Sequence, residues 1–178
     1  RRGGIAAAAA DLHRSSAGGQ VHIDCSSTGI LKSRESNTVE FKESFNKAST
    51  AKYAKTMAAY SNNRGGYIIF GVKDRPRTIV GLKNSNFENL NQEHFSEVNS
   101  LFAPAMEWDC GMFIFETPSH DEKPSMQFKI GWIYTEEAEL KPIIAQKSND
   151  GEKINSGDTF YRYRARSEKI KYADEEVK

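Results

Sequence analysis

Apolar and polar positions over residues 35–74 follow the periods of a strand, a helix and a second strand. In the segment VEFK (39–42), apolar and charged residues alternate, which is typical of a strand with one buried face. Small residues recur at helical spacing over residues 51–61, and they predict a helix that packs closely on a sheet. The segment NNRGG (62–66) ends this helix, because Asn and Gly accept left-handed backbone conformations. The apolar run YIIFGV (67–72) predicts a central strand covered on both faces.

Shorter patterns further along the chain predict a second helix and more strands. A helix is expected over residues 92–102, where Phe95, Val98, Leu101 and Phe102 share one face, and Pro104 ends it. Further strands are expected at residues 78–82, 107–117, 125–135 and 141–145, the first of them in a hairpin with the preceding strand. The predicted fold class is therefore α+β, or mixed α/β, with a mixed sheet and two main helices.

The segment TFYRYRARSEKI (159–170) alternates strictly and predicts one last strand. Its two faces differ in chemistry. One face carries Phe160, Arg162, Arg164 and Arg166, and the other carries Tyr161, Tyr163 and Ala165. We expect the arginines to point outward and the tyrosines to pack.

The first 32 residues differ from the rest of the chain. Alanine, glycine and serine dominate them, and the interpretation is a low-complexity or vector-derived extension outside the fold, although residues 21–25 could pair as a short strand. Residues 33–178 form the predicted domain, since the chain of 178 residues is long enough for one domain with a sizeable core.

Composition narrows the partners and the compartment. The net charge is +1, so any nucleic-acid surface must be a local basic patch. Cys25 and Cys110 lie far apart without a metal-binding spacing, which suits a reducing compartment. No run reaches the roughly twenty apolar residues of a membrane span, so we expect a cytoplasmic protein without a membrane partner.

Three motifs resemble the Schlafen/AlbA-type domain, in its bacterial, single-copy form. They are E-S-x-x-V-E-F-K (35–42), A-x-x-N-x-x-G-G-Y-I-I-F-G-V-x-D (59–74) and I-V-G-L (79–82), and the segments at 141–147 and 159–170 resemble the closing part of bacterial members. In the animal Schlafens that cut transfer and ribosomal RNA, the resemblance implies a three-carboxylate metal site, matching Glu35, Glu40 and Asp74 here. Those nucleases pair two such folds around a basic groove, so a single copy implies a homodimer.

Three carboxylates could hold Mg²⁺ or Mn²⁺, which prefer oxygen ligands. Such an ion would polarise a phosphodiester and generate hydroxide from a bound water, and Lys42 could assist at the phosphate. Glu35 and Glu40 are five residues apart, so they converge only if Glu35 lies in the turn before the strand. The alternative is that these carboxylates are solvated and pair with neighbouring cations.

Basic residues supply the second candidate site. The arginines of the last segment would bind backbone phosphates, with further cations at the turns extending the patch. The predicted set is Arg162, Arg164, Arg166, Lys169, Arg64, Arg75 and Arg77. The alternative is a charged strand face that only resists aggregation.

The Gly65-Gly66 pair does not predict a phosphate loop. It precedes a strand, and no G-x-x-x-x-G-K-[ST] motif occurs, so no ATP is expected. Three hypotheses remain open. The first is a divalent-metal endoribonuclease acting on structured, tRNA-like RNA. The second is a non-catalytic regulatory domain that binds DNA or RNA, and the third is a protein-interaction domain.

Overall fold

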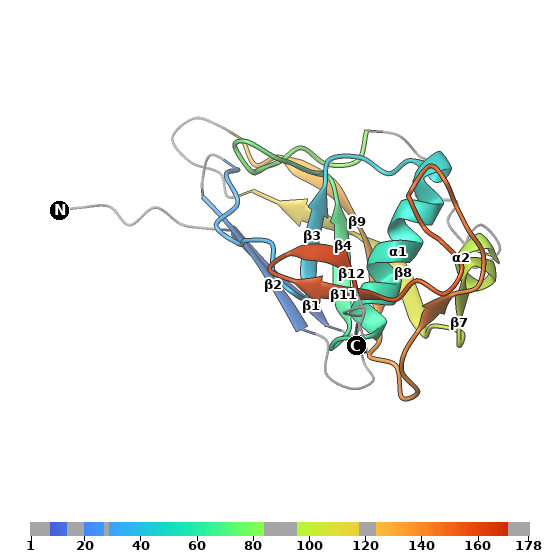
Figure 1. The fold of residues 1–178 in the computed structure, drawn as a ribbon. Helices are drawn as coiled ribbons and strands as arrows, with labels where there is room; N and C mark the ends of the chain where they lie inside the picture. The colour runs from blue at the N-terminus through green and yellow to red at the C-terminus, as the bar shows by residue number, and fades with distance from the viewer. Residues whose placement is uncertain (1–7, 14–19, 27–28, 84–95, 118–123, 171–178) are drawn as a thin grey trace, which may run out of the picture.

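The computed structural model describes residues 8–13, 20–26, 29–83, 96–117 and 124–170 (Figure 1). It confirms an α+β domain with a mixed sheet and two α-helices in this part of the chain. The elements are β1 (Ala8–His13), β2 (Gln20–Cys25), β3 (Val39–Lys42), the 3₁₀ turn η1 (Lys47–Ser49), α1 (Thr50–Ser61), β4 (Gly66–Phe70), β5 (Val72–Lys73), β6 (Thr78–Ile79), α2 (Ser96–Leu101), β7 (Phe102–Ala103), β8 (Trp108–Glu116), β9 (Gln127–Thr135), β10 (Ile144–Ala145), β11 (Phe160–Tyr163) and β12 (Arg166–Lys169).

A four-stranded sheet of order β3-β4-β9-β8 forms the centre of the molecule. β3 runs parallel to β4, while β9 is antiparallel to both β4 and β8. All five residues of β4 are buried, and they alternate between two cores: Ile68 and Phe70 pack with α1, whereas Tyr67 and Ile69 pack on the opposite face. The predicted central strand is therefore confirmed.

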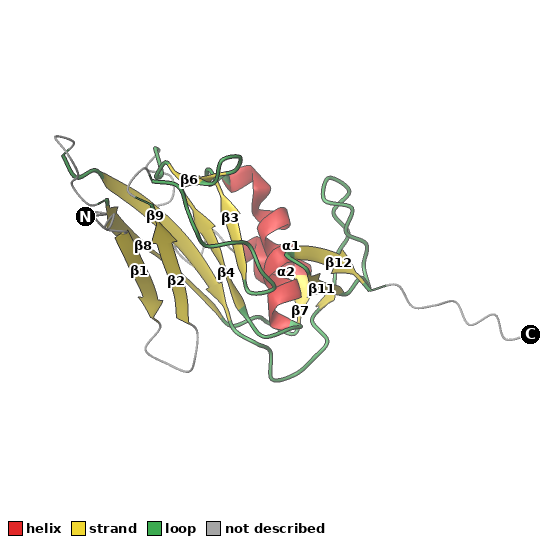
Figure 2. Cartoon of the chain, turned by 90° about the vertical axis from the view of Figure 1, so that its left-hand side faces the viewer, coloured by secondary structure: helices red, strands yellow, loops and turns green. Residues whose placement is uncertain are grey.

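Each face of the sheet has its own cover (Figure 2). α1 lies on one face, with the β11–β12 hairpin beyond it, and ten of its twelve residues are buried. The β1–β2 hairpin lies on the other face, where Ile23 and Cys25 pack with Tyr67 and Ile69. Leu31 joins the same core. The exclusion of residues 1–32 from the fold is thus wrong for this part of the segment, while the strand expected at 21–25 is confirmed.

The last segment is not one strand. β11 and β12 form an antiparallel hairpin in which Tyr163 pairs with Arg166, and a two-residue turn joins them. Arg164 has φ 45° and Ala165 has φ 64°. Positive φ at both central residues is the requirement of a type I′ turn, whose twist matches that of a hairpin. The prediction missed the turn because neither residue is Gly, Asn or Asp.

The described part of the second predicted helix is α2 (Ser96–Leu101). The helix ends one residue earlier than expected, because Phe102 already belongs to β7. Phe95 and the rest of the predicted start lie outside the described residues. Neither helix in these ranges has the length and hydropathy needed to cross a membrane.

The glycine turn after α1 fits its prediction. Gly65 has φ +74°, and its N–H donates to the carbonyl oxygen of Tyr60 at 2.9 Å. A Cβ added at Gly65 would lie 2.7 Å from the carbonyl oxygen of Thr135 in β9. The position therefore needs glycine for its backbone conformation and also for close packing.

Gly65→Ala should lower the free energy of unfolding by roughly 2–5 kcal/mol, which combines left-handed strain with steric overlap. Gly157→Ala is the matched control, because Gly157 has φ +91° but nothing within 4 Å of an added Cβ. It should cost only the strain, about 1–2 kcal/mol. Urea denaturation of both variants measures the difference, and equal costs would contradict the packing argument.

Candidate functional site

A buried ion pair joins β3 to the β11–β12 hairpin. The Nη1 atom of Arg162 donates to Oε2 of Glu40 at 2.8 Å, although the two residues are 122 positions apart. Only 1% of the Arg162 side chain is exposed. The same guanidinium donates to Oγ of Ser167 at 3.2 Å and to the carbonyl oxygen of Ser36 at 3.0 Å. It also lies over the ring of Tyr60, 4.9 Å from the centroid. These contacts tie the hairpin to β3, to the segment before it and to α1.

Glu40 is neutralised from two sides. Its Oε1 atom contacts Nζ of Lys42, while Oε2 is bound by Arg162. Beneath the pair, burial raises the pKa of Tyr60 well above its ordinary value, against the lowering effect of Arg162. The neutral phenol donates to the carbonyl oxygen of Tyr67 at 2.9 Å. Glu40 and Lys42 therefore belong to a structural network.

Glu35 lies in the turn before β3, as its convergence with Glu40 required. Its Oε1 atom accepts from the backbone N–H of Phe41 at 3.1 Å, which fixes the carboxylate beside the strand. Glu35 lines an open hollow together with Ser36, Asn37, Thr38, Arg164 and Ala165. The hollow lies between the segment before β3 and the turn of the β11–β12 hairpin.

Asp74 does not join the other two carboxylates. The register of β3 with β4 places Glu40 beside Ile68, whereas Asp74 follows β5, beyond the far end of β4. Its side chain is 73% exposed, and Oδ2 lies 3.8 Å from Nε of Arg75. Among the residues with described positions, no three His, Cys, Asp or Glu side chains are grouped to hold a metal ion.

The structure therefore does not bring Glu35, Glu40 and Asp74 together as the expected metal site. A divalent cation needs several free oxygen ligands in one place, but Glu40 already binds two cations and Asp74 lies elsewhere. The donor set does not fit Mg²⁺ or Mn²⁺. Lys42, expected to assist catalysis, neutralises Glu40 instead.

The hairpin presents the opposite faces from those expected. Phe160 and Arg162 point inward, while Tyr161 and Tyr163 are 42% and 49% exposed. The guanidinium of Arg164 lies over the ring of Tyr163, 5.2 Å from its centroid, and Arg166 pairs with Tyr163 across the hairpin. Alternation places Arg162 on the same face as Phe160, but it does not say which of the two faces is buried.

The remaining predicted basic residues are dispersed. Lys169 forms an ion pair with Asp158, with Nζ and Oδ2 2.5 Å apart. Burial raises the pKa of Asp158, but the hydrogen bonds from Lys169 and from the N–H of Asn155 outweigh it and lower the pKa overall. Arg77 donates to the carbonyl oxygen of Ser33 at 3.2 Å and lies over Phe41. Arg64 and Arg75 are exposed at separate turns, at the start of β4 and after β5.

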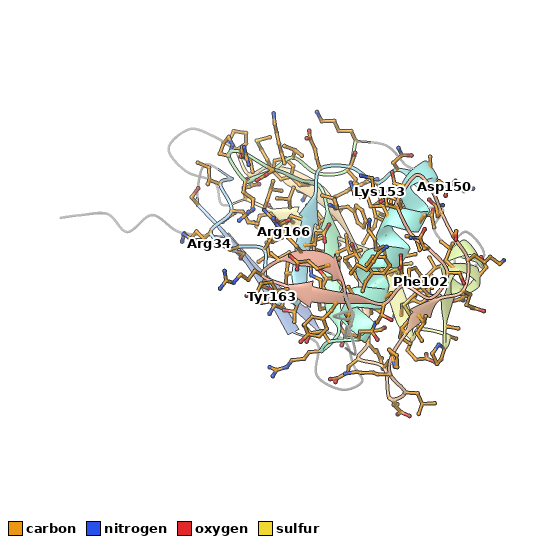
Figure 3. The ribbon with its side chains drawn as sticks, in the orientation of Figure 1. Arg34, Phe102, Asp150, Lys153, Tyr163 and Arg166 are labelled. Carbon is orange, nitrogen blue, oxygen red and sulfur yellow. The ribbon has the colours of Figure 1, made fainter. Side chains whose placement is uncertain are left out.

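Arg164 and Arg166 are the two predicted arginines that the structure places together on an exposed surface. Figure 3 shows Arg166 and Tyr163 toward the same side of the molecule as Arg34, and away from Asp150 and Lys153. We define Tyr161, Tyr163, Arg164 and Arg166 as the Tyr/Arg surface. Exposed aromatic rings can stack on the flat faces of bases, and arginines beside them can bind phosphates.

The fold and this surface define an α+β domain with a cationic, aromatic hairpin that packs on α1 and is joined to β3 by an ion pair. A sequence model of the family described as Schlafen, AlbA_2 matches residues 35–171, and the chain belongs to that family.

A curated relative from Ureaplasma parvum serovar 3 (strain ATCC 700970) is 60% identical over 152 residues and is named "Uncharacterized ATP-binding protein UU034". The match covers 83% of this chain but 43% of the relative, so the chain spans less than half of that protein's length. Among solved structures, the DIP2311 protein from Corynebacterium diphtheriae gives a TM-score of 0.47 at 17% identity, covering 80% of this chain and 24% of that one.

The name of the Ureaplasma relative overturns the expectation that ATP has no place in this protein. The lack of a phosphate-loop motif does not exclude other kinds of ATP site. The glycine turn itself is filled, because an added Cβ at Gly66 would lie 2.5 Å from the ring of Tyr60, and the N–H of Gly65 is already bonded. A nucleotide site in this chain would therefore lie away from the turn.

Arg162→Ala should lower the free energy of unfolding by about 3–5 kcal/mol, because Glu40 loses its buried partner. Arg166→Ala, four residues away on the exposed face, should change it by no more than about 0.5 kcal/mol. Thermal and urea unfolding of the two variants test this contrast. Similar stabilities for both would show that the ion pair does not hold the hairpin.

Proposed function

We propose that the Tyr/Arg surface binds single-stranded nucleic acid, with bases stacked on Tyr161 and Tyr163 and phosphates held by Arg164 and Arg166. The observation that carries the proposal is the inward position of Arg162, which leaves both tyrosines about half exposed beside Arg164 and Arg166, with Arg164 lying over the ring of Tyr163. Both rings can therefore be reached from solvent, and each combines a flat apolar ring with a polar hydroxyl group.

The spacing of the tyrosines suits successive bases. Residues two apart on a strand lie about 6.8 Å apart, which is twice the rise of about 3.4 Å per nucleotide in one strand of a duplex. A stretched single strand can therefore place one base on each ring. Stacking of this kind accepts every base, because each has a flat π-face.

The local charge of the Tyr/Arg surface favours binding of only a few phosphates. The chain carries a net charge of +1, so phosphate binding depends on the local cations Arg164 and Arg166, with Arg34 toward the same side. Glu168 stands opposite Tyr161 in the hairpin and limits the local charge. Few phosphates would be neutralised, so the affinity should fall with salt less steeply than for a wholly basic domain.

The same proposal includes ATP as a small-molecule ligand of the Tyr/Arg surface. The name of the Ureaplasma relative states ATP binding, and ATP offers one base and a chain of phosphates to the same kinds of side chain. The proposal contains no cleavage step, because the carboxylates that such a step required are used in the ion-pair network or lie apart.

Tyr161→Ala and Tyr163→Ala should each weaken binding of a single-stranded oligonucleotide of about twelve bases by about 5- to 150-fold, the loss of one stacking contact. Fluorescence anisotropy at low salt measures the affinity. Ile114→Ala is the control, since Ile114 is exposed on β8 at the other edge of the sheet. Unchanged affinity in both tyrosine variants, or no binding of any oligonucleotide or ATP to the wild-type chain, would refute the proposal.

Arg166→Ala should reduce the dependence of binding on salt. If Arg166 neutralises one phosphate, the slope of log affinity against log salt concentration should become shallower by about 0.7. The measurement is a salt titration of the same oligonucleotide. Lys147→Ala removes an exposed cation outside the hairpin and should leave the slope unchanged. An identical slope for wild type and Arg166→Ala would remove Arg166 from the phosphate contacts.

A further inference from the structure

We infer that the hollow beside the hairpin turn selects guanine, with Glu35 as the residue that determines specificity. This inference rests on the proposed binding of nucleic acid by the Tyr/Arg surface, and it adds a base preference to a surface whose stacking contacts accept any base.

The hollow adjoins the stacking face. Glu35, Ser36, Asn37 and Thr38 line one side of it, and Arg164 and Ala165 line the other. Arg164 belongs to both features, because its guanidinium also lies over the ring of Tyr163. A strand held on Tyr163 therefore passes the mouth of the hollow, where the edge of a neighbouring base can enter.

Glu35 is an acid on a basic surface. The exposed Arg34 precedes it in the chain, and Arg164 lines the same hollow. Even so, within the described residues its carboxylate has no ion pair, and its one hydrogen bond is the N–H of Phe41 on Oε1. A free carboxylate weakens phosphate binding nearby. Its place here is explained if it accepts hydrogen bonds from the ligand.

The backbone contact gives the carboxylate a fixed orientation. One of its oxygens is held by the N–H of Phe41 at 3.1 Å, and the side chain is half-buried. Each carboxylate oxygen has two acceptor positions, so Oε2 and the second position of Oε1 stay available. The group is thus a pre-oriented acceptor pair, which loses little freedom when a ligand binds.

Guanine is the base whose Watson–Crick edge matches such a pair. It places two adjacent donors, N1–H and the N2 amino group, toward a carboxylate. Adenine and cytosine offer one amino donor beside a ring nitrogen that accepts, and thymine or uracil offers one N–H between two carbonyls. Arg164 lines the other side of the hollow, and its guanidinium has five N–H donors, so it can donate to O6 or N7 of guanine as well as to a phosphate.

The test uses thymine oligonucleotides that carry isolated central guanine, adenine or cytosine bases, with fluorescence anisotropy as the readout. Wild-type protein should prefer the guanine oligonucleotide by about 5- to 150-fold, the range for one good bidentate contact. Inosine in place of guanine lacks the N2 amino group and should lose most of this preference. This comparison needs no protein variant.

Glu35→Gln should abolish the preference for guanine while binding of the plain thymine oligonucleotide persists, because the amide carries only one acceptor oxygen. Glu43→Gln removes an exposed negative charge beyond β3 and should keep the preference. Circular dichroism confirms that both variants fold.

The outcomes separate the two proposals. Equal binding of all four oligonucleotides, equal binding of inosine and guanine, or a preference that survives Glu35→Gln would overturn the guanine inference and leave the Tyr/Arg surface standing. Failure of the wild-type chain to bind any oligonucleotide would overturn both.

Discussion

The ion pair between Glu40 and Arg162 is the constraint on which the rest of this structure depends. A guanidinium that is 99% buried must have a charged partner, because an unpaired charge in the interior costs several kcal/mol. Here the partner comes from the first strand of the family motif, and the guanidinium comes from the last hairpin. The pair thus closes the domain, and it decides which face of the hairpin meets solvent.

The same pair changes the chemistry available to the family motif. Glu40 is held by Arg162 and Lys42, so it is no longer a free metal ligand. The parallel register of β3 and β4 leaves Asp74 at the far end of the sheet. Of the three carboxylates, Glu35 alone faces an open hollow while free of any ion pair in the described chain. Of the two acids in the segment E-S-x-x-V-E-F-K, Glu40 therefore has a structural role, and Glu35 is available for ligand recognition.

The Tyr/Arg surface follows from the pair by strand geometry. With Arg162 inward, the period of two forces Tyr161 and Tyr163 outward, and the type I′ turn carries Arg164 back over Tyr163. Both proposed ligands, an oligonucleotide and ATP, combine a flat base with phosphate.

Local signals in the chain are enough to predict several of its elements. The helix at 50–61, the glycine turn, the buried strand β4 and the long strands β8 and β9 all follow from periods of 3.6 or 2, or from one φ requirement, within a few residues. Other features could be known from the folded chain alone: the partner of Glu40, the inward face of Arg162, the separate position of Asp74 and the burial of Ile23 and Cys25. These depend on contacts between segments far apart in the chain, and alternation alone states that two faces differ without stating which one is buried.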